Sequence, residues 1–175
     1  RAPIENLPEI KGRTLYLVDK AGAAQSSLRT AQPSIKYDAL GDFYKAGLAN
    51  FNLGGTFNSR INLNLREDKG YTYGARSGFS GGPEFGSFGI SSEVNKDATA
   101  ASLTEVLTEL TNFTADGMSE EEYDYMRSAV GQRDALQYET PRRKLSLLNN
   151  IMRYDLPLNY RSQQNSILKE TDREV

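Results

Sequence analysis

Two runs rich in aromatic, serine and glycine residues, separated by a strong turn signal, constrain the fold more than any other feature of the sequence. "YTYGARSGFS" covers residues 71–80, "FGSFGISSEV" covers residues 85–94, and "GGPE" lies between them. Aromatic and β-branched residues favour strands, and a Gly-Pro cluster between two such runs favours a turn. The sequence therefore predicts an antiparallel β-hairpin near the middle of the chain.

Two strands and two helices are expected before this hairpin. "TLYLVDK" at 14–20 and "QSSLRTAQ" at 25–32 have strand composition and are joined by a glycine-containing turn. From Tyr37 the apolar residues recur at three and four positions, which indicates an amphipathic helix ending near "NLGG" at 52–55. A second helix is predicted over "TFNSRINLNLRED" at 56–68.

The sequence after the hairpin is predicted to be helical. Helices are expected over 97–114, from Ser119 with a capping box to Glu122, from Pro141 towards Pro157, and over about 160–169. Strands and helices thus come in pairs and do not alternate strictly. This order predicts an α+β fold with a largely antiparallel sheet packed on one face by helices.

Two amino acids are absent from the sequence, and their absence excludes several kinds of active site. The 175 residues include no cysteine and no histidine, which excludes thiolate chemistry, a serine triad with histidine and an H-E-x-x-H zinc helix within this sequence. The net charge of -2 gives no general field for nucleic acid. No apolar run approaches the roughly 20 residues of a membrane-spanning helix, so membrane insertion is not expected.

The two ends indicate how the chain is organised. The Pro-containing start predicts a linker over residues 1–12, followed by a single domain over residues 13–175. Thr171 and Glu174 have the spacing of a capping box, which opens a helix. We therefore expect the domain to be truncated at its C-terminal end.

Two other candidate sites are better explained as structure. Gly54 and Gly55 precede a helix, but the spacing is wrong for a phosphate-binding loop, so close packing between two helices is the expected role. The acidic run "SEEEYD" at 119–124 is typical of the first turn of a solvated helix.

The segment "LREDKGYTYG" at 65–74 is the strongest candidate site. Arg66 is expected at the end of a helix and Tyr73 early in the next strand, with Gly70 permitting the turn between them. A guanidinium and a phenol brought together this way suit a carbonyl or an oxyanion. The alternative is structural: an arginine that binds the last helix carbonyls, beside an ordinary strand tyrosine.

The amino-acid sequence of this region resembles that of a known protein family. "LGGTFNSRINLNLREDKGYTYGARS" is similar to the C-terminal-domain signature of the insulinase-like (pitrilysin, M16) zinc metallopeptidases and their mitochondrial processing peptidase relatives. "LYLVDKAGAAQSSLRTAQPSI", "GMSEEEYDYMRSAV" and "YDLPLNYRSQQNSILKETDREV" resemble other parts of the same domain, so the likeness covers nearly the whole chain.

The resemblance implies half of an active site. Domains of this family pair around a peptide-sized chamber; one half carries an inverted zinc motif, H-x-x-E-H, and the facing half contributes an arginine and a tyrosine seven residues apart that contact the scissile carbonyl. These residues correspond to Arg66 and Tyr73, with Tyr71 as the adjacent alternative. The expected partners are a peptide substrate and a zinc-bearing domain in the same polypeptide or in another subunit.

The zinc motif is absent from this sequence, so the resemblance implies that zinc is bound elsewhere in the complete enzyme and that the isolated chain is inactive. The alternative is a catalytically inactive core or scaffold subunit of a processing-peptidase-like assembly. Family habit further suggests a bacterial extracytoplasmic location, such as the periplasm.

Overall fold

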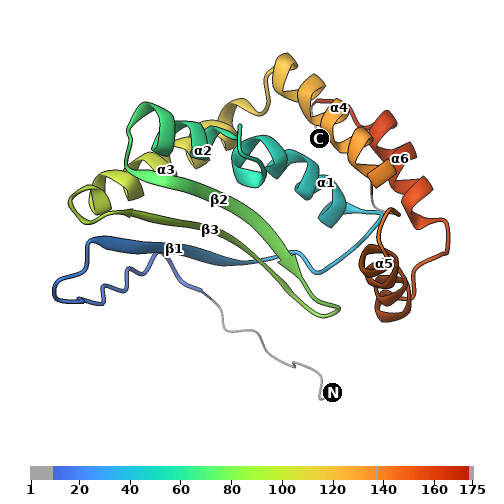
Figure 1. The fold of residues 1–175 in the computed structure, drawn as a ribbon, viewed down its shortest axis with the longest axis horizontal. Coiled ribbons are helices and arrows are strands. Elements are labelled where there is room, and N and C mark those ends of the chain that lie inside the picture. Colours follow the sequence, from blue (N-terminus) through green and yellow to red (C-terminus); the bar gives the residue numbers. More distant parts are fainter. Residues whose placement is uncertain (1–9, 137, 174–175) are drawn as a thin grey trace.

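A small antiparallel sheet forms one layer of the molecule (Figure 1). The computed structural model describes residues 10–136 and 138–173. Its three strands are ordered β1-β3-β2 and span β1 (Gln25–Ser34), β2 (Thr72–Gly81) and β3 (Gly86–Asn95). β2 and β3 form the predicted hairpin, and the amide of Gly82 closes its turn by donating to the Phe85 carbonyl at 2.8 Å.

Helices cover one side of the sheet, and α4, α5 and α6 continue beyond its end (Figure 1). In chain order the helical elements are α1 (Asp42–Asn50), a π-helical turn (Phe51–Gly55), α2 (Arg60–Asn62), a second π-helical turn (Leu63–Asp68), a 3₁₀ turn (Lys96–Ala98), α3 (Thr99–Asp116), α4 (Glu120–Leu136), α5 (Pro141–Tyr154) and α6 (Tyr160–Glu170).

The core lies between the sheet and the first helices. Along β3 buried residues alternate with more exposed ones, as expected for a strand with one covered face. The principal cluster of buried apolar side chains consists of Leu53, Ile61, Leu65, Ala75, Phe88, Ile90 and Val106. The α+β prediction, with an antiparallel sheet packed on one face by helices, is confirmed.

The strand predicted over residues 14–20 is wrong. This segment has no regular secondary structure, and Leu15, Tyr16, Leu17 and Val18 are 75%, 85%, 83% and 88% exposed. Strand propensity describes how well a side chain fits a sheet. A segment with high propensity forms a strand only when a neighbouring strand pairs with it. β1 pairs with β3, and in the described part of the chain residues 14–20 belong to no ladder.

Helix boundaries differ from the predictions where side chains bind the backbone. α1 begins at Asp42, later than Tyr37, because Asp38 Oδ1 accepts hydrogen bonds from the amides of Leu40 and Gly41 and holds a turn there. The helix predicted from residue 56 starts only at Arg60.

The other predicted boundaries fit more closely. The capping box is confirmed, since the Glu122 amide donates to Ser119 Oγ and the Ser119 amide donates to Glu122 Oε2. α3 and α6 lie within a few residues of their predicted ranges. The linker expected over 1–12 falls mostly outside the described residues, and so does Glu174 of the C-terminal capping box.

Gly54 serves a close approach to the sheet, which corrects the predicted helix–helix contact for this residue, whereas a Cβ on Gly55 would meet the Asn50 carbonyl oxygen of α1 at 3.0 Å. A Cβ on Gly54 would lie 2.2 Å from Ser77 Oγ and 2.6 Å from the Ser77 amide nitrogen on β2. Asn50 secures the same approach, because its Nδ2 donates to the Ser77 carbonyl at 3.1 Å. The first π-helical turn therefore packs directly on β2.

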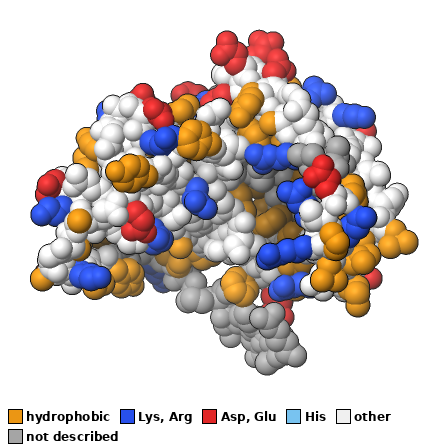
Figure 2. Space-filling view, viewed as in Figure 1, with side chains coloured by type: hydrophobic (Ala, Val, Ile, Leu, Met, Phe, Trp, Pro, Cys, Tyr) orange, Lys and Arg blue, Asp and Glu red, His pale blue; other side chains and the backbone are white. Residues whose placement is uncertain are grey.

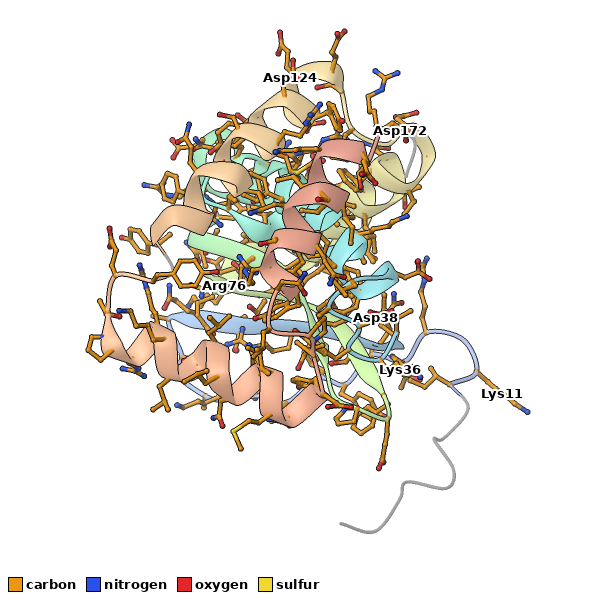
Figure 3. All side chains as sticks on the ribbon, turned by 90° about the vertical axis from the view of Figure 1, so that its right-hand side faces the viewer. Lys11, Lys36, Asp38, Arg76, Asp124 and Asp172 are labelled. Atoms are coloured by element: carbon orange, nitrogen blue, oxygen red, sulfur yellow. The ribbon has the colours of Figure 1, made fainter. Side chains whose placement is uncertain are left out.

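α5 stands apart from the other helices, below α4 and α6 in the view of Figure 3. None of its side chains is fully buried, and its apolar residues Leu145, Leu148 and Met152 are 65%, 53% and 83% exposed. Figure 2 shows hydrophobic and basic side chains gathered at the lower right, where α5 lies.

Candidate functional site

Arg66 and Tyr73 line one open cavity of about 480 Å³, although they come from different elements. Arg66 belongs to the second π-helical turn, and Tyr73 lies at the start of β2. The complete lining consists of Ala24, Gln25, Arg66, Glu67, Gly70, Tyr71, Thr72, Tyr73 and Asn95. The fold thus places Arg66 and Tyr73 in the lining of the same cavity.

A tight reversal brings the helix end to the strand start. Gly70 has φ +64°, in the left-handed region that favours glycine. On its far side the Tyr71 amide donates to the Leu65 carbonyl at 2.8 Å, and the Asn95 amide on β3 donates to the Tyr71 carbonyl at 2.8 Å. The first bond closes the helical turn at the Leu65 carbonyl, and the second fixes where β2 begins.

The Arg66 guanidinium is held over an aromatic ring. Its Cζ lies 4.3 Å from the centroid of the Phe57 ring, and its side chain is about a third exposed. Nη1 lies 3.0 Å from Glu67 Oε1, but among the described residues this nitrogen has no partner with hydrogen-bond geometry. Among the described residues Nη1 of Arg66 therefore donates to no helix carbonyl, and the Leu65 carbonyl accepts from the Tyr71 amide.

The two tyrosines of the segment have different surroundings. Tyr71 is partly buried and packs against the principal core cluster. Tyr73 is 90% exposed. A tyrosine with this exposure contributes almost nothing to the core, so its phenol is presented to the cavity and the solvent.

A β-bulge explains the exposure of Tyr73. The register of β2 on β3 pairs Thr72 with Val94 but Ala75 with Ser92, so β2 carries one extra residue at Tyr73 and Gly74. Bulges of this kind interrupt the ladder and redirect a side chain. Thr72 Oγ1 stabilises the bulge by donating to the Glu93 carbonyl at 2.6 Å and accepting from the Gly74 amide at 3.1 Å.

Asn62 connects the supports of both candidate residues. Its side chain is 2% exposed, its Nδ2 donates to the Phe57 carbonyl at 2.6 Å, and its Oδ1 accepts from the Ala75 amide at 2.8 Å. The loop that presents the Phe57 ring and the strand that presents Tyr73 are therefore joined through one buried amide.

Asn64 and Lys69 anchor the second π-helical turn to α3. Asn64 Nδ2 donates to Glu105 Oε2 at 3.1 Å and to Glu109 Oε1 at 2.7 Å, and Lys69 Nζ lies 3.4 Å from Glu105 Oε1. The hydrogen bond from Asn64 is the main reason that the pKa of Glu105 is lowered. The turn that carries Arg66 is thereby tied to the longest helix.

The supporting residues Phe57, Asn62 and Thr72 were not found from the sequence, and neither was Ser92, whose Oγ lies 3.0 Å from Thr72 Oγ1. One signal was available: in "INLNL" the asparagines occupy positions within an otherwise apolar helical pattern, where a buried amide must find partners. The bulge at Tyr73 and Gly74 left no comparable signal, because it depends on the register against β3.

The side chains do not fit a metal centre in the described ranges. In residues 10–136 and 138–173 no group of three or more His, Cys, Asp or Glu side chains is placed to hold a metal ion. The cavity offers cationic and phenolic donors, which suit anionic or carbonyl oxygen. In the same ranges no helix has both the length and the apolar character needed to cross a bilayer.

Comparisons with known proteins agree with this fold. The peptidase M16 inactive domain from Pseudomonas fluorescens superposes with a TM-score of 0.78 at 25% identity, over 87% of this chain and 36% of that one. The periplasmic protease PqqL from Escherichia coli gives 0.66 at 17% identity over 87% of this chain. A protease from Helicobacter pylori gives 0.70 at 14% identity over 86%.

These solved structures are longer than the present chain, which spans 17% of PqqL and 39% of the Helicobacter pylori protease. No curated protein sequence matches the chain closely enough to count as a relative. The family profile described as "Peptidase M16 inactive domain" matches residues 2–130, which is well over half of the sequence. The chain therefore belongs to the M16 peptidase family, as an inactive-type, insulinase-like domain.

Proposed function

We propose that the chain is the non-zinc-binding domain of an M16-type zinc metalloendopeptidase, closing the substrate chamber and contacting the scissile carbonyl through Arg66 and Tyr73. One observation carries the proposal: a guanidinium and a phenol from separate elements line the same open cavity. The support around them is specific, with Tyr73 on a bulge and Arg66 on an aromatic ring.

The proposed role of Arg66 and Tyr73 is to bind and orient the carbonyl group of the substrate. The guanidinium offers planar N–H donors and the phenol offers one O–H donor, and both suit a carbonyl oxygen that gains negative charge during hydrolysis. Such donors accelerate a reaction when they are aligned before charge develops. An extended peptide reaches them by pairing with an edge of the sheet, whose outer strands in the described part of the chain are β1 and β2.

The hydrolytic centre is assigned to another domain or subunit. Zinc in the complete enzyme would be bound by an H-x-x-E-H-bearing M16 domain, in cis or in trans, and no step assigned to this chain runs through the metal. The isolated chain is expected to be inactive towards peptides. An extracytoplasmic bacterial location belongs to the same proposal, and the periplasmic location named for PqqL is consistent with it.

A second candidate is a catalytically inactive core or scaffold subunit of a processing-peptidase-like assembly. The observation in its favour is the exposed apolar run Leu15–Val18, together with the uncovered apolar residues of α5. Exposed apolar surface of this kind is typical of protein contact sites. A scaffold would use the same fold without needing donors at the cavity.

Kinetics of the complete peptidase distinguish the two candidates. Arg66→Ala and Tyr73→Phe are each expected to lower kcat/KM for a peptide substrate about a hundredfold, the usual cost of losing one oxyanion donor. Thermal unfolding of Tyr73→Phe should match the parent protein because Tyr73 is 90% exposed, and Arg66→Ala should remain folded at the assay temperature with a small loss from the contact with Phe57.

Matched controls use residues of the same type outside the cavity. Arg76, labelled in Figure 3, is an exposed cation on β2, and Tyr16 is an 85% exposed phenol. Arg76→Ala and Tyr16→Phe should leave kcat/KM within a factor of two. If the cavity variants also stay within a factor of two, the carbonyl-contact role is wrong and the scaffold candidate gains support.

A further inference from the structure

Phe57 has an unusual position for a large apolar side chain. Its ring is 63% exposed, so it gains little from burial, yet the Arg66 Cζ lies 4.3 Å from its centroid. A guanidinium at this distance from a ring face is attracted by the electron density above the ring. The Phe57 ring therefore contributes more to holding the Arg66 guanidinium than to the packing of the core.

The loop that carries Phe57 is fixed at the backbone. Asn62 Nδ2 donates to the Phe57 carbonyl at 2.6 Å, and the same loop is closed by Ser59 Oγ donating to the Thr56 carbonyl at 2.6 Å. Asn62 and Ser59 are 2% and 0% exposed. If either hydrogen bond were lost, water could not replace it for the Asn62 amide or the Ser59 hydroxyl. The backbone beneath an exposed ring is thus held by buried polar groups.

The same buried amide reaches the other half of the site. Asn62 Oδ1 accepts from the Ala75 amide at 2.8 Å, immediately after the bulge at Tyr73 and Gly74. The loop that carries Phe57 and the strand that carries Tyr73 are therefore both hydrogen-bonded to the side chain of Asn62. Arg66 also has a competing contact, since Glu67 Oε1 lies 3.0 Å from Nη1 without hydrogen-bond geometry.

We propose that Phe57 is a positioning residue for Arg66: its ring holds the guanidinium at the cavity, against the pull of Glu67, at a spacing from Tyr73 that Asn62 fixes. This inference rests on the proposed carbonyl-contact function and adds a residue that acts only through Arg66. Without the ring the guanidinium keeps its 3.0 Å contact with Glu67 but loses its second support, and its donors are no longer held in line with the substrate.

A double-mutant cycle in the complete peptidase tests the assignment. Phe57→Leu keeps an apolar side chain but removes the ring face, and it is expected to lower kcat roughly tenfold with a smaller change in KM. Combined with Arg66→Ala, the same substitution should change kcat/KM less than twofold. Phe57→Tyr keeps the ring and should stay within threefold of the parent enzyme.

Phe85→Leu is the matched control, because Phe85 is a 42% exposed aromatic residue at the tip of the hairpin, outside the cavity lining. It should leave kcat unchanged. Equal losses from Phe57→Leu with and without Arg66 would overturn the positioning role, and so would a Tyr variant as slow as the Leu variant. If Arg66→Ala itself keeps full activity, the proposed function fails and this inference fails with it.

Discussion

Ser92 Oγ on β3 lies 3.0 Å from Thr72 Oγ1 and 3.1 Å from the Gly74 carbonyl on β2, so one buried hydroxyl spans the bulge that carries Tyr73. Bulges sacrifice ladder hydrogen bonds, and they persist where other groups replace those bonds. Ser92, which is 3% exposed, supplies part of that replacement from within the sheet.

Ser92→Ala is therefore expected to reduce activity without unfolding the protein. Loss of the hydroxyl leaves the polar groups of the bulge with fewer partners and should cost about 1 kcal/mol of unfolding free energy. We expect kcat/KM of the complete peptidase to fall several-fold because Tyr73 is less firmly held. Ser87→Ala, on the other face of the same strand, is the control; equal behaviour of the two variants would contradict the bulge-support role.

Leu65→Ala tests the anchoring of the helical turn before Arg66. Leu65 is 1% exposed and belongs to the principal core cluster, whereas its neighbour Leu63 is 40% exposed. Truncating a buried leucine typically costs about 2–5 kcal/mol, through lost burial and the cavity left behind. Chemical denaturation should show this loss for Leu65→Ala and less than about 1 kcal/mol for Leu63→Ala; similar losses would mean that the turn is not anchored by the core.

Gly54→Ala tests the close approach between the first π-helical turn and β2. The added Cβ would meet Ser77 Oγ at 2.2 Å and the Ser77 amide nitrogen at 2.6 Å, and backbone cannot move aside as a flexible side chain does. A cost of about 1–3 kcal/mol in unfolding free energy is expected from overpacking.

Gly47→Ala is the control for that clash, because no atom lies within 4 Å of a Cβ added at this exposed position in α1. It should be neutral or stabilising by up to about 1 kcal/mol, since alanine is the better helix former. Thermal unfolding of the two variants in parallel checks the sign. An unchanged midpoint for Gly54→Ala would show that β2 and the turn can separate freely.

The ion pair between Arg60 and Glu122 predicts a pH dependence of stability. Burial raises the pKa of Glu122, but hydrogen bonds from Arg60 and Ser119 outweigh that effect, and its pKa in the folded protein lies below the ordinary value of 4.5. A lowered pKa means that the pair stabilises the fold above about pH 4.5, and that this contribution is lost as the pH falls through the folded pKa.

Glu122→Gln should consequently lower the unfolding free energy at pH 7 by about 1–2 kcal/mol, and the difference from the parent protein should shrink as the pH falls below 4.5. The first-turn neighbour Glu121 is exposed, so Glu121→Gln serves as the control with little effect at either pH. Denaturation midpoints measured across this range check both statements. A difference that grows in acid would reverse the assigned sign.

Local sequence patterns were sufficient for the hairpin and for the later helices. Gly-Gly-Pro-Glu lies between two aromatic runs that pair with each other as β2 and β3, and Ser119 with Glu122 closes its capping box within four residues. The absence of histidine and cysteine also needs no structure to exclude a zinc site with His or Cys ligands within this sequence.

Local patterns did not predict features that depend on residues distant in the sequence. Residues 14–20 have strand composition but belong to no ladder in the described part of the chain, whereas Tyr73 lies in a bulge that exists only relative to β3. The sequence brought Arg66 and Tyr73 to attention through their positions around the Gly70 turn and through the family resemblance, but their supports, Phe57 and Asn62, became visible only from contacts across loops and strands.

The physical reason is the range of the interactions. Caps, turns and helical periodicity are set by atoms within a few residues, so composition and spacing encode them directly. A bulge, a buried amide bridge and a ring beneath a guanidinium require segments that only packing brings together, and their energies are settled by burial and register. In this chain the arginine and tyrosine of the candidate site were identified from local sequence, while the hydrogen bonds of Asn62 and Ser92 around them depend on the fold.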